Sequence, residues 1–176
     1  MKTSIALVGF MGTGKTVVGK LLAERLGKEF LELDALIEQK AGKTIPEIFQ
    51  QEGEVAFREL EIEAAREASR KKNVVIACGG GVVLNKINID RLKKDCLIVY
   101  LTASPRVILE RTASDENERP LLKSDNRALA VKELLRFRKP FYERAADITI
   151  DTSKLDIDSV VEQIIARVKA NEGFNR

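Results

Sequence analysis

The segment from Gly9 to Thr16, Gly-Phe-Met-Gly-Thr-Gly-Lys-Thr, has the residue types and the spacing of a phosphate-binding loop, G-x-x-x-x-G-K-[ST]. Its glycines allow successive backbone N–H groups to point inward and to cradle phosphate oxygens. In such a loop, Lys15 would reach the β and γ phosphates, and the Thr16 hydroxyl would coordinate Mg²⁺ directly. This segment therefore predicts a nucleoside triphosphate site.

The residues on either side of the loop favour this prediction over a glycine-rich turn that binds nothing. The apolar run Ile5–Val8 precedes the loop and is typical of a buried parallel strand. After the loop, apolar residues recur at helical spacing from Val18 to Leu26. A helix at that place would direct the positive end of its dipole at the phosphates.

Two carboxylates near the end of the second predicted strand, Phe30–Leu33, are candidates for binding the metal or the acceptor. Glu32 and Asp34 are two residues apart, so on a strand their side chains would point to the same face. Either carboxylate could orient Mg²⁺ through its water shell, or hold and deprotonate an acceptor hydroxyl. The alternative is that Asp34 caps the next helix, and the two roles can coexist.

Three glycines and two basic segments are candidates for an acceptor site. Gly79–Gly81 follow the third predicted strand, and such a run suits close approach of a ligand to the main chain, with a sharp turn as the alternative. Arg58 lies three residues before Glu61 on a predicted helix, and residues 136–142, which include Arg138, form a second basic, aromatic cluster. Two guanidinium groups that converge on a carboxylate would clamp it, but spacing alone does not show that they converge. The alternatives are an exposed ion pair at Arg58 and a solvated basic surface around Arg138.

Short apolar runs alternate with helical patterns along the whole chain, which predicts an α/β fold with a parallel sheet between helices on both faces. The predicted strands are Ile5–Gly9, Phe30–Leu33, Val74–Ala77, Leu97–Leu101 and Ile148–Ile150. The predicted helices are Lys15–Leu26, Asp34–Lys40, Pro46–Lys71, Ile87–Lys94, Pro105–Thr112, Ala128–Arg144 and Ile157–Val168.

Two segments interrupt this alternation. The long, charged segment from Ile45 to Lys72 could form a flap over the site, with Gly53 as a break. The polar segment Ala113–Pro120 is the best candidate for a lid, because a phosphotransferase must keep water away from the γ-phosphate. A solvated surface connection is the alternative for that segment. We expect the C-terminal residues Asn171–Arg176 to be frayed.

The composition fits a single domain over residues 1–176 and excludes several classes of function. Thirty basic and 27 acidic residues leave a formal charge of +3, and the charges are interspersed, which does not favour nucleic-acid binding. The absence of histidine excludes acid–base chemistry and metal ligation by that residue. The two cysteines have no metal-ligand spacing. No signal peptide and no membrane-spanning run is found, so we expect a cytoplasmic protein.

Together, these motifs resemble the shikimate kinase family over nearly the whole sequence, up to Asp151-Thr152. The matching motifs, in order, are Gly-Phe-Met-Gly-Thr-Gly-Lys-Thr at 9–16, Asp34, Phe57-Arg58-x-x-Glu61, Gly79-Gly80-Gly81, Arg119-Pro120-Leu121-Leu122 and Arg138-x-Pro140-x-Tyr142. The family implies a three-layer P-loop fold of the nucleoside-monophosphate-kinase type, whose five-stranded parallel sheet has the order 2-3-1-4-5. It also implies a substrate-binding helical insertion at residues 34–72 and a mobile lid at residues 112–127.

The activity implied by the resemblance is ATP-dependent phosphorylation of the 3-hydroxyl of shikimate to shikimate 3-phosphate, a step toward chorismate and the aromatic amino acids. Lys15, Asp34 and Arg119 would be catalytic, with Asp34 at the acceptor hydroxyl and Arg119 moving from the lid to the phosphates. The implied ATP-binding residues are Gly12, Thr13, Gly14, Lys15, Thr16, Val17, Arg111, which would stack on adenine, and Arg119. The implied shikimate-binding residues are Asp34, Gly79, Gly80, Gly81, and the carboxylate-holding pair Arg58 and Arg138.

Mg²⁺ is the implied cofactor, held directly by Thr16 and through water by Glu32. The family pattern has an aspartate at the position of Glu32. The extra methylene of Glu32 keeps the charge but moves the carboxylate.

The sequence leaves two alternatives to a shikimate kinase. A polyol acid such as gluconate is another possible acceptor, although gluconate kinases are not expected to carry Arg58 together with Gly79–Gly81. A nucleotide-binding regulatory domain is an alternative of another class, but a binding module needs no acceptor residues. We therefore expect a monomeric enzyme that acts on ATP and shikimate and that binds neither nucleic acid nor a membrane.

Overall fold

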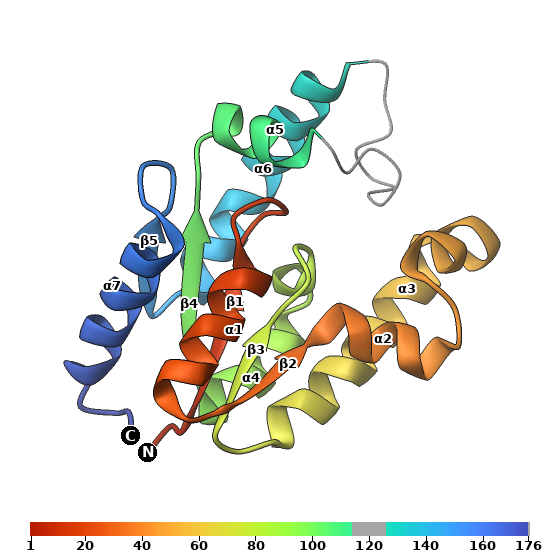
Figure 1. Cartoon of the computed structure of the whole chain (residues 1–176). Helices are drawn as coiled ribbons and strands as arrows, with labels where there is room; N and C mark the ends of the chain where they lie inside the picture. The colour runs from red at the N-terminus through yellow and green to blue at the C-terminus, as the bar shows by residue number, and fades with distance from the viewer. Residues whose placement is uncertain (114–125, 176) are drawn as a thin grey trace.

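A computed structural model describes residues 1–113 and 126–175. Its centre is a five-stranded parallel sheet with the order β2-β3-β1-β4-β5, which confirms the predicted fold class and strand order (Figure 1). The strands are β1 (Ser4–Val8), β2 (Glu29–Glu32), β3 (Val74–Ala77), β4 (Cys96–Thr102) and β5 (Ile148–Asp151). The helices are α1 (Lys15–Leu26), α2 (Leu33–Ala41), α3 (Ile45–Arg70), the short 3₁₀ helix η1 (Val82–Leu84), α4 (Lys86–Asp95), α5 (Pro105–Thr112), α6 (Arg127–Ala145) and α7 (Ile157–Lys169).

Helices cover both faces of the sheet, because the strands are apolar on both faces. On β1, Ile5 and Leu7 pack into a core with α1 and α7, whereas Ala6 and Val8 pack into a second core with α2, α3, α4 and α6. All five residues of β1 are buried. The apolar run Ile5–Val8 was therefore correctly predicted to be a buried parallel strand. Such a strand is apolar at successive positions because neither of its faces meets water.

The carboxyl end of β1 leads directly into the predicted phosphate loop. Gly14 takes a left-handed conformation, with φ 90°, immediately before α1 begins at Lys15. A residue with a Cβ adopts this conformation only at a cost, so the glycine allows the loop to turn sharply into the helix. The amino end of α1 therefore faces the same edge of the sheet as the ends of β2 and β3.

The predicted helical insertion is formed by α2 and α3, which pack on each other at one side of the sheet (Figure 1). A capping box at Thr44 and Glu47 begins α3. The predicted break at Gly53 is confirmed, because that residue has φ 84° and ψ 175° and kinks the helix. The kink turns the first part of α3 away from the rest of the helix.

The expectation of a frayed C-terminus was wrong for the residues that the structure describes there. Phe174 is 8% exposed and packs with the core on the α1 and α7 face. Lys2 forms a parallel bridge with Phe174, and its backbone N–H donates to the Gly173 carbonyl at 2.8 Å. The buried ring of Phe174 and these backbone contacts hold the C-terminal segment against the core.

The predicted lid falls mostly on residues 114–125, which lie outside the described residues, and so does Arg119. Among the helices that the structure describes, none has the length and the apolar character needed to cross a membrane.

Candidate active site

The phosphate loop is held by its own side chains. The Lys15 Nζ donates to the carbonyls of Gly9 and Phe10, at 2.8 and 2.9 Å. The Thr13 hydroxyl donates to the same Phe10 carbonyl at 2.8 Å. Lys15 therefore lies across the mouth of the loop, where its charge would meet bound phosphates.

A hydroxyl and a carboxylate meet beside this loop. The Thr16 hydroxyl donates to Glu32 Oε1 at 2.9 Å. Burial raises the pKa of the Glu32 carboxyl, the hydrogen bond from Thr16 opposes that rise, and the charge of Asp34 adds to it. Both groups are oxygen ligands of the kind that Mg²⁺ prefers, and Mg²⁺ takes its other ligands from water and phosphate. The donor set therefore fits the implied metal ion.

Asp34 lies in the first turn of α2, not on β2, which ends at Glu32. The prediction that Glu32 and Asp34 share one face of a strand was therefore wrong. The helix begins earlier than predicted, because Leu33 is already helical and buried in the core. The two carboxylates are still close enough for the charge of Asp34 to raise the pKa of Glu32.

A cavity of about 620 Å³ opens between the phosphate loop, α2, α3, α6 and the end of β3. It brings together every residue predicted to bind the acceptor. Its lining residues are Met11, Asp34, Glu38, Thr44, Ile45, Pro46, Phe49, Phe57, Arg58, Glu61, Gly79, Gly80, Gly81 and Arg138.

The three glycines after β3 are needed because charged groups crowd their main chain. A Cβ on Gly79 would come within 2.8 Å of Asp34 Oδ1, and one on Gly80 within 3.3 Å of Arg138 Nη1. A Cβ on Gly81 would collide with the Arg58 guanidinium. A sharp turn alone would not call for three glycines, whereas the packing of three charged side chains against the backbone favours a glycine at each position.

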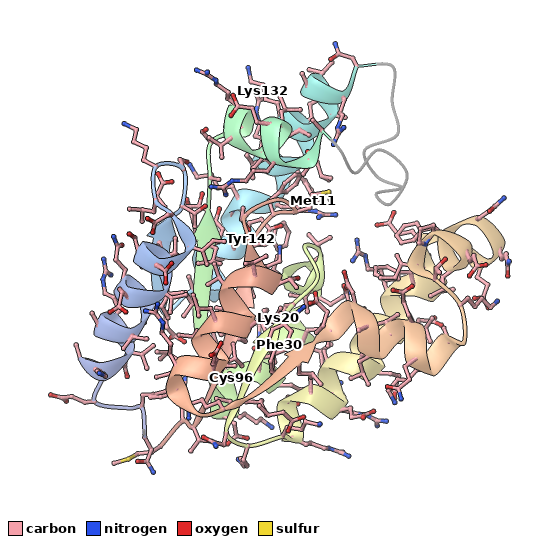
Figure 2. All side chains as sticks on the ribbon, in the orientation of Figure 1. Met11, Lys20, Phe30, Cys96, Lys132 and Tyr142 are labelled. Carbon is pink, nitrogen blue, oxygen red and sulfur yellow. The ribbon has the colours of Figure 1, made fainter. Side chains whose placement is uncertain are left out.

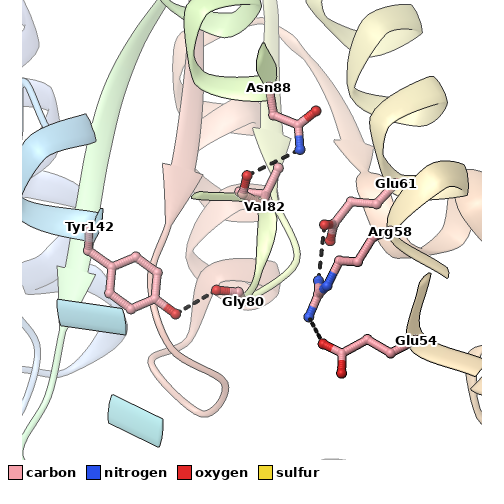
Figure 3. A network of polar contacts seen from close by, with 7 residues as sticks. All are labelled: Glu54, Arg58, Glu61, Gly80, Val82, Asn88 and Tyr142. Atoms are coloured by element: carbon pink, nitrogen blue, oxygen red, sulfur yellow. Dashed lines mark hydrogen bonds and ion pairs between the residues drawn. The ribbon is translucent and has the colours of Figure 1, made fainter. Parts of the chain in front are cut away.

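Arg58 is held by two carboxylates of α3 (Figure 3). It pairs with Glu61 at 3.0 Å and with the more exposed Glu54 at 3.3 Å. The alternative of an exposed ion pair at Arg58 and Glu61 was wrong, since only 1% of the Glu61 side chain is exposed. Burial raises the pKa of Glu61, and the neighbouring Arg58 opposes that rise.

Arg138 is the largest buried polar side chain in the described residues, with 2% of its surface exposed. Its guanidinium lies 5.9 Å from the centre of the Phe10 ring and lines the cavity. Its neighbour Phe137 is 63% exposed, so the basic run 136–142 divides between a solvated face and a buried face that carries Arg138 and Tyr142. A buried guanidinium beside an open cavity is suited to an anionic ligand.

The family of this chain follows from comparison of its sequence with those of known proteins. The profile described as shikimate kinase matches residues 11–169. The chain belongs to the shikimate kinase family. A shikimate kinase of Caldanaerobacter subterraneus subsp. tengcongensis is 50% identical over 92% of this chain and 94% of its own length. One from Thermodesulfovibrio yellowstonii is 50% identical over 92% of each chain.

Solved structures of shikimate kinases have the same fold. The structure described as shikimate kinase from Acinetobacter baumannii in complex with shikimate has a TM-score of 0.93 and 40% identity, and covers 98% of this chain and 96% of that one. The shikimate kinase from Aquifex aeolicus has a TM-score of 0.83 and 36% identity, with 96% and 97% of the two chains covered. The predicted family is thus confirmed.

Arg111 connects the phosphate loop to the end of β5. Its Nη1 donates to the Thr152 hydroxyl at 3.0 Å and to the Gly12 carbonyl at 3.3 Å, and its Nη2 donates to the Thr152 carbonyl at 2.9 Å. Arg111 is not among the residues that line the cavity. Stacking of Arg111 on adenine, which the shikimate kinase resemblance implies, stays a prediction.

The sequence did not predict that two phenylalanine rings form an apolar wall of the cavity. Phe49 and Phe57 lie on either side of the kink at Gly53, and their ring centres are 4.8 Å apart. Both rings line the cavity. Helical periodicity alone assigns them to a buried face, and only the kink brings them together over the site. In the sequence, the predicted break at Gly53 was the one signal for this arrangement of the two rings.

Gly81→Ala tests the close approach of Arg58 to the backbone. We expect the KM for the acceptor to rise by roughly 10²-fold, because the added methyl group displaces the guanidinium by about 1 Å. Gly81 has φ −99°, so alanine fits the backbone itself. Steady-state kinetics with Gly173→Ala as a remote control measure the effect. An unchanged KM for the acceptor would show that Arg58 does not need its observed position.

Proposed function

We propose that this shikimate kinase family member transfers the γ-phosphoryl group of ATP to the 3-hydroxyl of shikimate through the residues of the described cavity. The observation that carries the proposal is the arrangement of Arg58 and Arg138. Both line one cavity, on α3 and α6, beside the phosphate loop residue Met11. Two guanidinium groups suit a carboxylate, and the adjoining loop suits a nucleotide.

The acceptor would lie with its carboxylate between the two arginines and its hydroxyls toward Asp34. The Asp34 carboxylate lies against Gly79, at the start of the glycine turn, and the Arg58 guanidinium lies against Gly81, at its end. Asp34 would hold the reacting hydroxyl and accept its proton as the phosphoryl group arrives. The phenylalanine wall would exclude water from the ring of the acceptor.

Lys15 would offset the negative charge that develops on the transferred group. Thr16 and Glu32 would hold Mg²⁺, the first directly and the second through water. When bound, Mg²⁺ neutralises part of the charge on the β and γ phosphates. The proposed roles of Arg111 at adenine and of Arg119 at the phosphates follow from the family resemblance.

We also propose that the protein works in the cytoplasm as a monomer, without nucleic acid or a membrane as a partner. The residues that the proposed reaction uses all come from one chain, so the reaction needs no residue of a second copy. The small net charge of +3, dispersed along the sequence, agrees with small-molecule substrates.

A coupled assay for ADP release tests the proposed function. The protein is incubated with ATP and Mg²⁺, and with shikimate, gluconate or no acceptor. We expect ADP release to depend on shikimate, and ³¹P NMR to show one new phosphomonoester. ADP release that is equal with and without shikimate, or that responds only to gluconate, would contradict the proposal.

Glu32→Ala tests the metal-binding role of a residue that departs from the family pattern. We expect the Mg²⁺ concentration needed for half-maximal activity to rise by about tenfold, because the carboxylate no longer orients the waters of the ion. Glu32→Asp should have a milder effect, since those waters absorb a displacement of one methylene. A titration of Mg²⁺ against activity measures both changes. Glu29→Ala, at the exposed start of the same strand, is the control, and a curve for Glu32→Ala that matches it would make Glu32 structural.

A further inference from the structure

Tyr142 lies behind the acceptor cavity and has no surface of its own in that cavity. It belongs to α6, where Figure 2 labels it, one turn after Arg138. Its side chain is completely buried. Its ring stacks on Tyr100 of β4, with ring centres 5.0 Å apart and an interplanar angle of 19°. The stack fixes the direction in which the phenol points.

The Tyr142 hydroxyl points at the glycine turn. It donates to the Gly80 carbonyl at 2.5 Å, and Figure 3 shows it reaching the turn from the side opposite Arg58. Gly80 in turn faces Arg138, since a Cβ on Gly80 would lie 3.3 Å from Arg138 Nη1. One hydroxyl thus connects the helix that carries Arg138 with the turn against which Arg58 lies.

The hydroxyl is protonated at neutral pH and remains a donor. Burial raises the pKa of the Tyr142 phenol, and the charge and hydrogen bonding of Arg138 oppose that rise only in part. Glycine peptides rotate easily because no Cβ restricts them. A turn of three glycines therefore needs an anchor, and Asn88 supplies a second one by donating from Nδ2 to the Val82 carbonyl at 3.2 Å.

We infer that Tyr142 is a positioning residue for the acceptor: its hydroxyl fixes the Gly80 peptide, and through it the relative positions of Arg138 and the glycine turn. The inference rests on the proposed function, because it assigns Tyr142 to the shikimate side of the site. Removing the hydroxyl leaves a buried carbonyl without its donor, and the turn reorients to satisfy it.

Two matched substitutions test this inference. Tyr142→Phe keeps the ring and the stack but loses the hydroxyl at Gly80. Tyr100→Phe loses the other hydroxyl of the same stack, which interacts with Thr102. We expect Tyr142→Phe to raise the KM for shikimate by about five- to tenfold, the effect of one buried hydrogen bond, and to leave the KM for ATP within about twofold. Tyr100→Phe should leave both KM values unchanged.

A spectroscopic measurement covers the case in which Tyr142→Phe does not fold. The chain has two tyrosines, so Tyr100→Phe protein grown with 3-fluorotyrosine carries one fluorine-bearing residue, at position 142. We expect its ¹⁹F resonance to shift when shikimate is added at saturation, and to shift little with ADP alone. A resonance that does not respond to shikimate would overturn the inference.

The outcomes separate the inference from the proposed function. If the unmodified protein does not phosphorylate shikimate, the proposed function fails. If the unmodified protein is active but Tyr142→Phe and Tyr100→Phe have the same KM for shikimate, only the positioning role fails. If Tyr142→Phe lowers the thermal midpoint but leaves the KM for shikimate unchanged, Tyr142 is a core residue and the inference is overturned.

Discussion

Replacing Lys15 with alanine is expected to lower kcat by at least 10²–10³-fold at saturating ATP and shikimate. The range is typical for the loss of one group that stabilises charge in a transition state. The Lys15 ammonium lies across the phosphate loop, held by the carbonyls of Gly9 and Phe10. These two contacts fix the direction of the ammonium group, and a charge that is fixed in this way stabilises a transition state without reorganisation.

The measurement is turnover in the coupled assay, with thermal unfolding as a check on folding. Lys86→Ala is a suitable control, because the Lys86 side chain is 85% exposed and pairs with Asp90 on the surface of α4. Turnover of Lys15→Ala close to that of the control would remove the phosphate loop from the catalytic site.

Arg58→Lys and Arg138→Lys are each expected to raise the KM for shikimate by roughly 5- to 150-fold. This range corresponds to about 1–3 kcal/mol for a hydrogen bond to a charged group. Arginine presents a planar fork that pairs with both oxygens of a carboxylate, whereas lysine is a point charge. The KM for ATP should change far less, because the phosphate loop is untouched. Turnover should also fall if the clamp sets the angle of the acceptor hydroxyl.

The chain offers a matched control on the same helix. Arg66 pairs with Glu63 at 2.6 Å, three residues apart like Arg58 and Glu61, but both side chains are about half exposed. Arg66→Lys should leave both KM values unchanged. An acceptor analogue without the carboxylate should be a poor substrate that is nearly indifferent to either cavity substitution. If Arg58→Lys and Arg138→Lys lower the thermal midpoint but not the affinity for shikimate, they are structural residues.

The parts of the site that sequence could predict are those fixed by backbone chemistry. The phosphate loop was predictable because its glycines, Lys15 and Thr16 must follow a strand and begin a helix. The strand order came from the family resemblance, and the alternation of apolar runs fixed only the layers. Asp34 was predicted both to share a strand face with Glu32 and to begin the next helix, since a carboxylate at a strand–helix junction fits either element, and the structure places it in the first turn of α2.

Properties set by packing across the chain could not be predicted. Spacing placed Arg58 and Glu61 on one face of a helix, but nothing local showed that this face is buried. The same holds for Arg138, whose neighbours in the basic run are exposed. Tyr142 was visible only as part of a motif, because its partner Gly80 lies 62 residues away in the chain.

The thiols of Cys78 and Cys96 are buried, and neither has a role in the proposed reaction. Cys78 stands directly before the glycine turn, and Cys96 begins β4 at the other end of the sheet (Figure 2). Burial raises the pKa of both, that of Cys96 to about 12. Since the thiolate is the reactive form, neither sulfur is open to alkylation or oxidation while the sheet stays closed. The rate at which each sulfur reacts would therefore measure how often its end of the sheet opens, and a ligand in the acceptor cavity would slow the reaction of Cys78 alone.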